Sequence, residues 1–187
     1  MRKLIMWNLI TLDGMFEGSQ PWDLQFHEYA WGDELRDFSL EQGQEAGALL
    51  FGRRTYEGMA AYWSEATDEI ADFMNAVPKY VVSRTLEDAD WANSTLVKDD
   101  VVGAVSRLKE QEGKDLFVFG SAELSDTLLR HGLFDELRIG LVPFVLGDGS
   151  PLFKQGFGPS RLALRQTRPL GDRCLLLVYE PMRAGDS

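Results

Sequence analysis

Residues suited to binding phosphate follow three apolar runs of the chain, at the points where each run ends. The three junctions are Ala48–Phe51 before Gly52-Arg53-Arg54-Thr55, Tyr80–Val82 before Ser83-Arg84-Thr85, and Leu116–Phe119 before Gly120-Ser121. Arginine presents fixed, forked donors to a phosphate, and glycine lets a ligand approach the backbone closely. The plainer interpretation of each junction is local: solvated arginines at a helix start, turn residues, and a tight turn whose serine caps a helix.

The combination of the three junctions carries more information than any one of them. If the three runs are parallel strands, their carboxyl ends lie at one edge of a sheet, and open α/β sheets bind their ligands at that edge. The sequence therefore predicts an anionic ligand there, and a nucleotide suits the glycines and arginines best.

The chain as a whole is acidic. Its 187 residues include 19 Lys and Arg against 30 Asp and Glu, which gives a formal net charge of −11. This balance disfavours nucleic acid as a partner, because nucleic-acid-binding proteins present a basic face. An anionic cofactor must be held by a local positive site that works against the overall field, so Arg53 and Arg54 are more informative here than in a basic protein.

Features that would direct the chain to a membrane or out of the cell are not evident in the sequence. Cys174 is the single cysteine and lies in an apolar run, so neither a disulfide framework nor a cysteine zinc site can form. Met1–Ile10 is basic and then apolar, but Asp13 soon follows, and we interpret the segment as a first strand rather than a signal peptide. No apolar run approaches the ~20 residues that a membrane helix needs. We expect a cytoplasmic protein.

The elements that must position the three junctions alternate along the chain. Helical spacing of apolar residues predicts helices over Asp33–Gln44, after Gly52, within Thr67–Ala76, and at Val101–Leu108 and Leu124–Leu129. Strands and helices thus alternate up to Gly132, which predicts an α/β fold with a largely parallel sheet.

The chain after Gly132 follows a different pattern. The runs Leu137–Val142, Leu162–Thr167 and Leu175–Tyr179 have no helical segment of comparable length between them, and Leu170-Gly171-Asp172 is typical of a hairpin tip. We expect antiparallel strands at one side of a mixed sheet. Since no linker or repeat is evident, residues 1–187 are expected to form one domain.

These motifs, in this order, resemble a known superfamily. Thr11-Leu12-Asp13-Gly14, Gly52-Arg53-Arg54-Thr55-Tyr56-Glu57, Val82-Ser83-Arg84-Thr85-Leu86 and Phe119-Gly120-Ser121 are similar to motifs of the dihydrofolate reductase superfamily. The closest resemblance is to the reductase domain of the bifunctional riboflavin-biosynthesis deaminase-reductase and its stand-alone bacterial relatives, and it spans about Arg2 to Tyr179. It implies a dihydrofolate-reductase-like mixed sheet with helices on both faces. No deaminase domain precedes it, so we do not expect the complete bifunctional enzyme.

The resemblance also implies NADPH as the cofactor and assigns its contacts. Arg53 and Arg84, with Ser83, would bind the 2′-phosphate. The pyrophosphate would face Gly52, Arg54 and Thr55 together with Gly120, Ser121 and Ala122, where helix N–H groups favour anions. We expect Gly120 to be glycine because the pyrophosphate approaches closely; the alternative is that its backbone conformation requires glycine.

The substrate side is expected along the end of the first strand. Asn8, Asp13 and Gly14 would line the nicotinamide and substrate pocket, and Asp13 is the candidate catalytic carboxylate. The alternative role of Asp13 is that of a turn residue.

Two features depart from the family pattern. Glu123 follows the glycine turn in the first turn of the next helix, where its carboxylate would compete with a phosphate. Dihydrofolate reductases carry an acidic residue on the first helix that binds the pterin, and none of Asp33, Glu34 and Asp37 aligns with it securely. A folate substrate is therefore not supported.

The remaining chemically active residues have structural interpretations. Neither His27 nor His131 is a strong candidate for acid–base catalysis. An aromatic segment could form a lid over a flat substrate, although packing is favoured; its aromatic residues are Trp22, Phe26, Tyr29 and Trp31. The acidic cluster of Glu65, Asp68, Glu69 and Asp72 is best explained as a solvated helix face, so no metal site is expected.

The sequence thus favours an NADPH-dependent reductase that acts on a small heterocyclic molecule. Candidate substrates are 5-amino-6-(5-phosphoribosylamino)uracil and related pyrimidines or pteridines. The alternative is a non-catalytic protein that binds or senses NADP(H). We expect a homodimer, from the resemblance and from the apolar runs Leu137–Leu146 and Cys174–Val178, which exceed what one sheet face needs.

Overall fold

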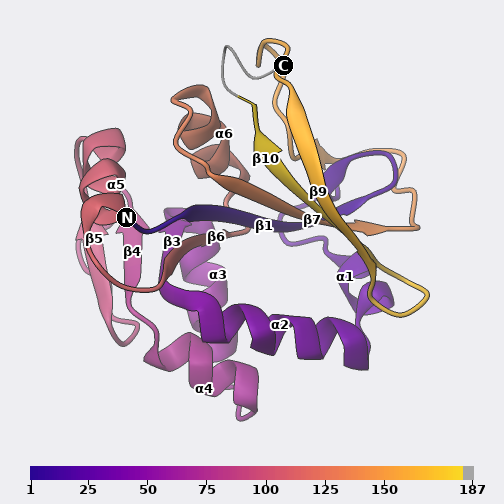
Figure 1. Ribbon diagram of the computed structural model, residues 1–187. Coiled ribbons are helices and arrows are strands. Elements are labelled where there is room, and N and C mark those ends of the chain that lie inside the picture. Colours follow the sequence, from indigo (N-terminus) through magenta and orange to yellow (C-terminus); the bar gives the residue numbers. More distant parts are fainter. Residues whose placement is uncertain (183–187) are drawn as a thin grey trace.

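The computed structural model describes residues 1–182, whose centre is an eight-stranded sheet with the order β5-β4-β3-β6-β1-β7-β10-β9 (Figure 1). Its strands are β1 (Leu4–Thr11), β3 (Ala46–Gly52), β4 (Lys79–Val82), β5 (Ser94–Val97), β6 (Asp115–Phe119), β7 (Glu136–Val142), β9 (Leu162–Pro169) and β10 (Leu175–Pro181). A two-stranded sheet pairs β2 (Met15–Glu17) with β8 (Ser150–Pro151). The helices are α1 (Gln25–Ala30), α2 (Asp33–Glu45), α3 (Arg53–Trp63), α4 (Glu69–Ala76), α5 (Val101–Glu110) and α6 (Ala122–Arg130).

The strand directions confirm the mixed sheet that the sequence predicts. From β5 to β7 every neighbouring pair of strands is parallel, and β10 is antiparallel to both β7 and β9. The predicted hairpin tip is also present, because the N–H of Leu170 donates to the carbonyl of Cys174 at 2.8 Å and Gly171 has φ 68°. The carboxyl ends of β1, β3, β4 and β6 therefore lie at one edge of the sheet.

Helices cover both faces of the sheet, and the alternation of side chains along β1 shows how. Leu4 and Met6 belong to a core cluster that includes residues of α5 and α6, whereas Ile5 packs in a second cluster with residues of α3 and α4. Trp7 and Leu9 continue on the face of Ile5 and pack with α1 and α2. In Figure 1, α5 and α6 accordingly lie above the sheet, and α2 and α4 lie below it.

The elements that the sequence did not predict are all short. β2, β5 and β8 have 3, 4 and 2 residues, and α1 has 6. Segments of this length show too little hydrophobic period to be recognised, so their existence depends on pairing with distant parts of the chain.

The helices themselves are of modest length. The longest, α2, has 13 residues, and within residues 1–182 no helix has the length and apolar character needed to cross a bilayer. Asp68, a member of the acidic cluster expected on a solvated helix face, is exposed and also caps α4 by accepting a hydrogen bond from the N–H of Ala71 at 2.8 Å.

Candidate functional site

A cavity of about 920 Å³ opens at the carboxyl edge of the sheet. Three of the predicted residues, Asp13, Gly14 and Arg84, are not part of its wall. The other predicted residues all line it: Asn8, Gly52, Arg53, Arg54, Thr55, Ser83, Gly120, Ser121 and Ala122. Since α3 starts directly after Gly52 and α6 directly after Ser121, the N-termini of two helices meet at this cavity.

The cavity has two chemically different sides. The phosphate side is formed by residues 52–55, Ser83 and residues 120–122, with Thr127, Ser150 and Lys154 beyond them. The aromatic side is formed by Trp7 and Leu9 of β1, Leu35 of α2, Met59 and Trp63 of α3, and Trp22 and Trp31. These two names are used below. Lys154 was not expected in the site, because nothing in its local sequence distinguishes it from a surface lysine.

The turn between β6 and α6 has a left-handed backbone at two successive residues. Gly120 has φ 65° and Ser121 has φ 57°. The hydroxyl of Ser121 does not cap α6; it accepts a hydrogen bond from the N–H of Gly52 at 3.1 Å and so joins the ends of β6 and β3. The first N–H groups of α6 consequently have no side-chain partner, as an anion-binding helix terminus requires.

Gly120 is required by its own backbone. Its φ lies in the left-handed region, which L-residues other than glycine adopt only with strain. A Cβ at this position would also lie 3.2 Å from Cγ2 of Thr55. The structure therefore supports the alternative explanation of this glycine, and the explanation by ligand room stays a prediction.

Arg53 connects the ends of β3 and β4 at the cavity. Its Nη1 donates to Oγ1 of Thr85 at 2.7 Å, and its Nε donates to the Glu57 carboxylate at 2.8 Å. Two of the five guanidinium N–H donors are thus used, and the side chain is 46% exposed, so the remaining donors are accessible to a phosphate.

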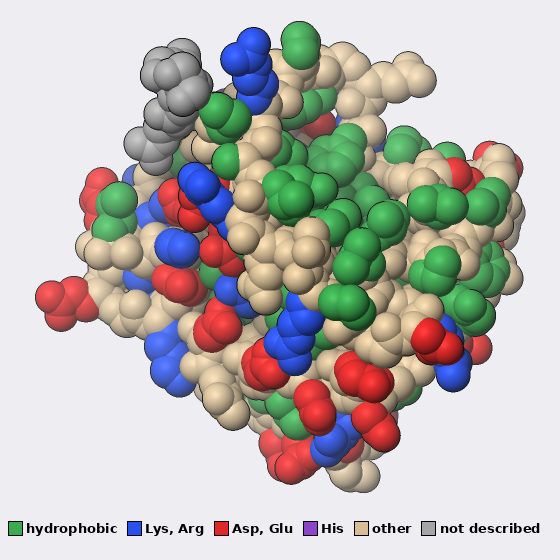
Figure 2. Space-filling view, turned by 45° about the vertical axis from the view of Figure 1, so that its right-hand side comes forward, with side chains coloured by type: hydrophobic (Ala, Val, Ile, Leu, Met, Phe, Trp, Pro, Cys, Tyr) green, Lys and Arg blue, Asp and Glu red, His purple; other side chains and the backbone are tan. Residues whose placement is uncertain are grey.

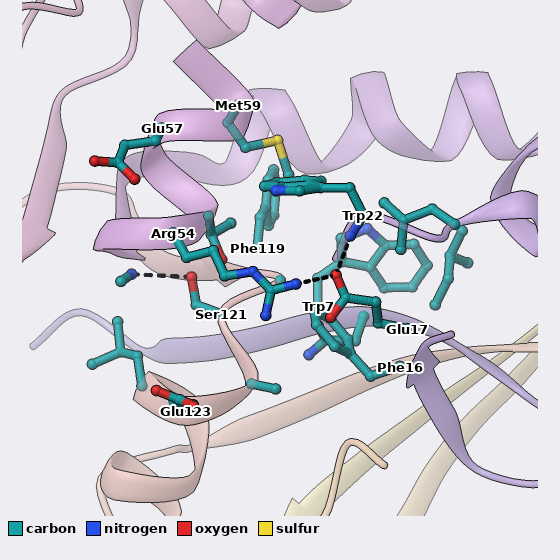
Figure 3. A pocket seen from close by; sticks show the side chains of 18 of the residues that line it. Trp7, Phe16, Glu17, Trp22, Arg54, Glu57, Met59, Phe119, Ser121 and Glu123 are labelled. Atoms are coloured by element: carbon teal, nitrogen blue, oxygen red, sulfur yellow. Dashed lines mark hydrogen bonds and ion pairs between the residues drawn. The ribbon is translucent and has the colours of Figure 1, made fainter. Parts of the chain in front are cut away.

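Arg54 makes a contact that the sequence did not suggest. Its Nη2 donates to Oε1 of Glu17 at 2.5 Å, and the N–H of Trp22 donates to the same oxygen at 2.5 Å. Figure 3 shows both donors reaching this carboxylate. Glu17 is 7% exposed, so the ion pair is largely shielded on one side, and it fastens the start of the aromatic segment to α3.

The aromatic segment is divided between the cavity and the core. The indole of Trp22, whose φ is 64°, lies so close to Gly58 of α3 that a Cβ there would overlap it. Trp31 also lines the cavity, whereas Phe26 is fully buried and Tyr29 packs edge-on against Phe144 with ring centroids 5.9 Å apart. Packing and cavity formation are therefore both roles of this segment.

The neighbouring residues Ser83 and Arg84 differ in their placement. Ser83 is buried at the cavity, and its Oγ accepts the N–H groups of Thr85 at 3.2 Å and Leu86 at 3.0 Å. These contacts match the turn interpretation, although the hydroxyl proton is still available to a ligand. Arg84 is exposed, and its binding of a 2′-phosphate stays a prediction.

Asp13 occupies the turn role that was the alternative to catalysis. Its carboxylate accepts hydrogen bonds from Oγ1 of Thr11 at 2.5 Å and from the N–H groups of Gly147 at 2.8 Å and Leu146 at 3.3 Å. These bonds, the one from Thr11 first, lower the pKa of Asp13. The carboxylate thus ties the end of β1 to the loop after β7, outside the cavity, and Gly14 with φ 82° completes the turn.

Three polar side chains at the cavity have buried atoms without a hydrogen-bond partner among the described residues. They are both amide atoms of Asn8, Oε1 of Gln42 and Nε2 of His27. Burial lowers the pKa of His27 to about 4, so its ring is neutral near pH 7. Gln42 is 1% exposed. Its position in the apolar stripe of Leu35 and Phe38 is the sequence signal that could have identified it as a buried site residue. Such atoms usually find a partner, here a ligand or water.

Comparison with known proteins agrees with this arrangement. Residues 2–176 match the family model described as the RibD C-terminal domain. The uncharacterized protein YyaP of Bacillus subtilis (strain 168) is 28% identical over 186 residues, which cover 95% of this chain and 94% of YyaP. A candidate riboflavin biosynthesis protein of Shewanella sp. PV-4 superposes with a TM-score of 0.81 at 19% identity, covering 97% of this chain and 99% of that one. Dihydrofolate reductase of Enterococcus faecalis, complexed with NADP(H), superposes with a TM-score of 0.59 at 12% identity over 96% of each chain.

The structural likenesses confirm the dihydrofolate-reductase-like fold predicted from the motifs, with which the strand order and the two helical layers agree. The family model covers nearly the whole chain. The motifs that resemble those of this family lie at the ends of β1, β3, β4 and β6. This chain belongs to the RibD C-terminal domain family.

Proposed function

We propose that this protein is an NADPH-dependent reductase that transfers a hydride to a small heterocyclic substrate. The observation that carries the proposal is the two-sided cavity, in which Arg53, Ser83 and the start of α6 face one side and aromatic side chains form the other. The first side suits the phosphates of a dinucleotide, and the second suits flat rings. The fold shared with a reductase complexed with NADP(H) supports the same assignment.

The residues of the phosphate side fit this cofactor. We assign its 2′-phosphate to Arg53 and Ser83, with the exposed Arg84 as a second candidate. Its pyrophosphate is assigned to Thr55 and the N–H groups at the start of α6, which Ser121 leaves uncapped. The donor set is the one that phosphate prefers: a guanidinium, hydroxyls and helix N–H groups.

Bound at this site, NADPH would supply the hydride, and the protein would supply position and electrostatics. The aromatic side would hold a C=N or C=O carbon of the substrate. We assign the accompanying proton to water, since Asp13 lies outside the cavity and Glu17 is engaged by Arg54 and Trp22. Candidate substrates are 5-amino-6-(5-phosphoribosylamino)uracil and related pyrimidines or pteridines.

The decisive experiment measures NADPH binding and NADPH oxidation separately. Calorimetry gives the affinity, and a panel of pyrimidines, pterins and quinone-like compounds tests turnover. Oxidation with any member supports the reductase, and failure to bind NADPH contradicts it. Tight binding without turnover across the panel supports the alternative of a non-catalytic NADP(H)-binding or sensing protein.

A further inference from the structure

Positive charge at the cavity lies on its phosphate side. Within residues 1–182, the lysine and arginine side chains that line the cavity are Arg53, Arg54 and Lys154. Arg53 is held by Glu57 and Thr85 near the end of β4, and Lys154 also borders a second groove beside α6. Arg54, whose guanidinium donates to the same oxygen as the N–H of Trp22, is paired with Glu17. A phosphate on the aromatic side would therefore meet a cation that is already paired with a largely buried carboxylate.

Two polar groups in the wall beside the aromatic side are already paired within the chain. Trp63 donates its Nε1 hydrogen to the sulfur of Met59 at 3.2 Å, and Ser39 donates its hydroxyl to the carbonyl of Leu35 at 2.8 Å. Trp7 packs edge-on against Phe38, with ring centroids 5.2 Å apart. Such walls stabilise flat apolar surfaces and disfavour a charged group.

Unpaired buried polar atoms at the cavity belong to Asn8, His27 and Gln42 among the described residues, and Gln42 is the one that α2 contributes. It projects from the buried face of α2 that also carries Leu35 and Phe38, is 1% exposed, and has an Oε1 without a partner among the described residues. A primary amide both donates and accepts, and therefore matches the N–H and C=O edge of a lactam ring.

The carboxylates of α2 do not offer a counter-ion for a protonated ring. Asp33, Glu34 and Asp37 are exposed and lie outside the cavity wall. Glu41 and Glu45 instead form ion pairs with Arg168 of β9 and Arg138 of β7. A neutral amide thus replaces a carboxylate as the polar group that α2 presents to the cavity.

We propose that the substrate is an uncharged, planar heterocycle that carries no phosphate, and that Gln42 selects it by hydrogen-bonding its lactam edge. This inference rests on the proposed reductase function and narrows its substrate. It argues against the phosphorylated aminopyrimidine as the physiological substrate, since the cation beside the aromatic side, Arg54, is already paired with Glu17.

Two matched pairs of probes test the phosphate and the lactam edge separately. Binding to the protein saturated with NADP⁺ is measured by calorimetry, so that turnover is not needed. The first pair is 5-amino-6-ribosylaminouracil and its 5′-phosphate; we expect the phosphate to weaken binding at least tenfold. The second pair is lumazine, a neutral pteridine-dione, and 2,4-diaminopteridine, and we expect lumazine to bind more tightly. Tighter binding of the phosphorylated probe, or no binding of the neutral probes at millimolar concentration, overturns the inference.

Variants of Gln42 test the hydrogen bond itself. Gln42→Leu should weaken lumazine about tenfold while the melting temperature of the apoprotein is kept or raised, because a buried unpaired amide is removed. Gln42→Glu should shift preference toward the diaminopteridine. Gln44→Leu, the same substitution at an exposed position of α2 outside the cavity wall, is the matched control and should change neither affinity. Equal affinity for lumazine in the wild type and Gln42→Leu would contradict the assignment.

The affinity for NADP⁺, measured for every variant, separates this inference from the function on which it rests. If the wild type does not bind NADP⁺, the reductase proposal itself is wrong. Normal NADP⁺ binding combined with preference for the phosphorylated probe would leave the reductase intact and defeat only the narrower inference.

Discussion

Glu17 and Arg54 form an ion pair across the mouth of the cavity, with Nη2 to Oε1 at 2.5 Å. The same carboxylate oxygen accepts the N–H of Trp22. Arg54, which the motif pattern assigns to a pyrophosphate, therefore anchors the aromatic segment, and a phosphate would have to compete with a largely buried carboxylate for it. For the proposed cofactor we therefore expect Arg53 to be the principal cation.

The contact between Trp22 and Gly58 can be measured with a double-mutant cycle. An alanine within a helix is more stable than glycine by about 1 kcal/mol, so Gly58→Ala should stabilise α3 in a Trp22→Ala background. In the wild type the new Cβ would overlap the indole, and the gain should be cancelled or reversed. Chemical denaturation of the wild type, the two single variants and the double variant gives four free energies of unfolding, from which the coupling energy follows. Equal effects of Gly58→Ala in both backgrounds would show that the indole does not lie there in solution.

Arg53→Ala should distinguish NADPH from NADH. Loss of one charge-assisted contact should cost on the order of 1.5–3 kcal/mol in NADPH binding and little in NADH binding. Arg84→Ala tests the second candidate for binding the 2′-phosphate in the same way. Glu57→Gln should strengthen NADPH binding modestly, because it frees Nε of Arg53. Titration calorimetry with both cofactors decides. Equal losses for NADPH and NADH in Arg53→Ala would mean that Arg53 does not bind the 2′-phosphate.

Gly120→Val should unfold the apoprotein at a lower temperature, whether or not a cofactor binds. The left-handed backbone at φ 65° makes a β-branched side chain strained, at a cost of about 1–3 kcal/mol. Ser121→Ala should cost less, about 0.5–1.5 kcal/mol, because it removes one neutral hydrogen bond from Gly52. An apoprotein of unchanged melting temperature that no longer binds NADPH would restore the original explanation, in which the glycine only makes room for a phosphate.

His27 should make stability depend on pH below neutrality. Burial lowers its pKa from 6.5 to about 4, so the unfolded chain takes up the proton first as the pH falls. The free energy of unfolding is therefore unaffected by His27 above pH 6.5. It falls progressively as the pH decreases toward 4, by up to about 3 kcal/mol. His27→Gln should flatten this part of the profile. Parallel profiles for the wild type and His27→Gln between pH 6.5 and 5 would contradict the assignment.

We predict a homodimer in solution. The edge strand β9 exposes Leu162 and Leu164, which are 37% and 55% exposed. With Phe153, Leu162 also lines the groove of about 730 Å³ beside α6. Figure 2 shows hydrophobic side chains gathered in a patch on the face turned toward the viewer. Sedimentation at micromolar concentration tests the prediction: a species of 21.1 kDa there would contradict it, and Leu164→Lys should weaken the dimer if β9 takes part.

Much of the fold could be predicted because it depends on local signals. The helical spacing before Gly132 and its absence afterwards distinguish the parallel part of the sheet from the antiparallel end. The glycine and arginine junctions could be placed together for a geometric reason, since parallel strands bring their carboxyl ends to one edge.

The roles of individual side chains at that edge were decided by the tertiary structure. Asp13 and Arg84 occupy promising positions in the sequence, yet the first bonds the loop after β7 and the second lies outside the cavity wall. The direction of a side chain after a strand depends on turn geometry and on distant partners, which local sequence does not specify.

What the sequence by itself determined is the order of the longer elements and the edge of the sheet at which the glycine and arginine junctions meet. Only the tertiary structure decided that Glu17 pairs with Arg54 at a separation of 37 positions and that Gln42 faces the cavity with an unpaired oxygen. The physical reason is that periodicity and turn chemistry act over a few residues. Burial and pairing of polar groups, in contrast, depend on which distant segments the packed core brings together.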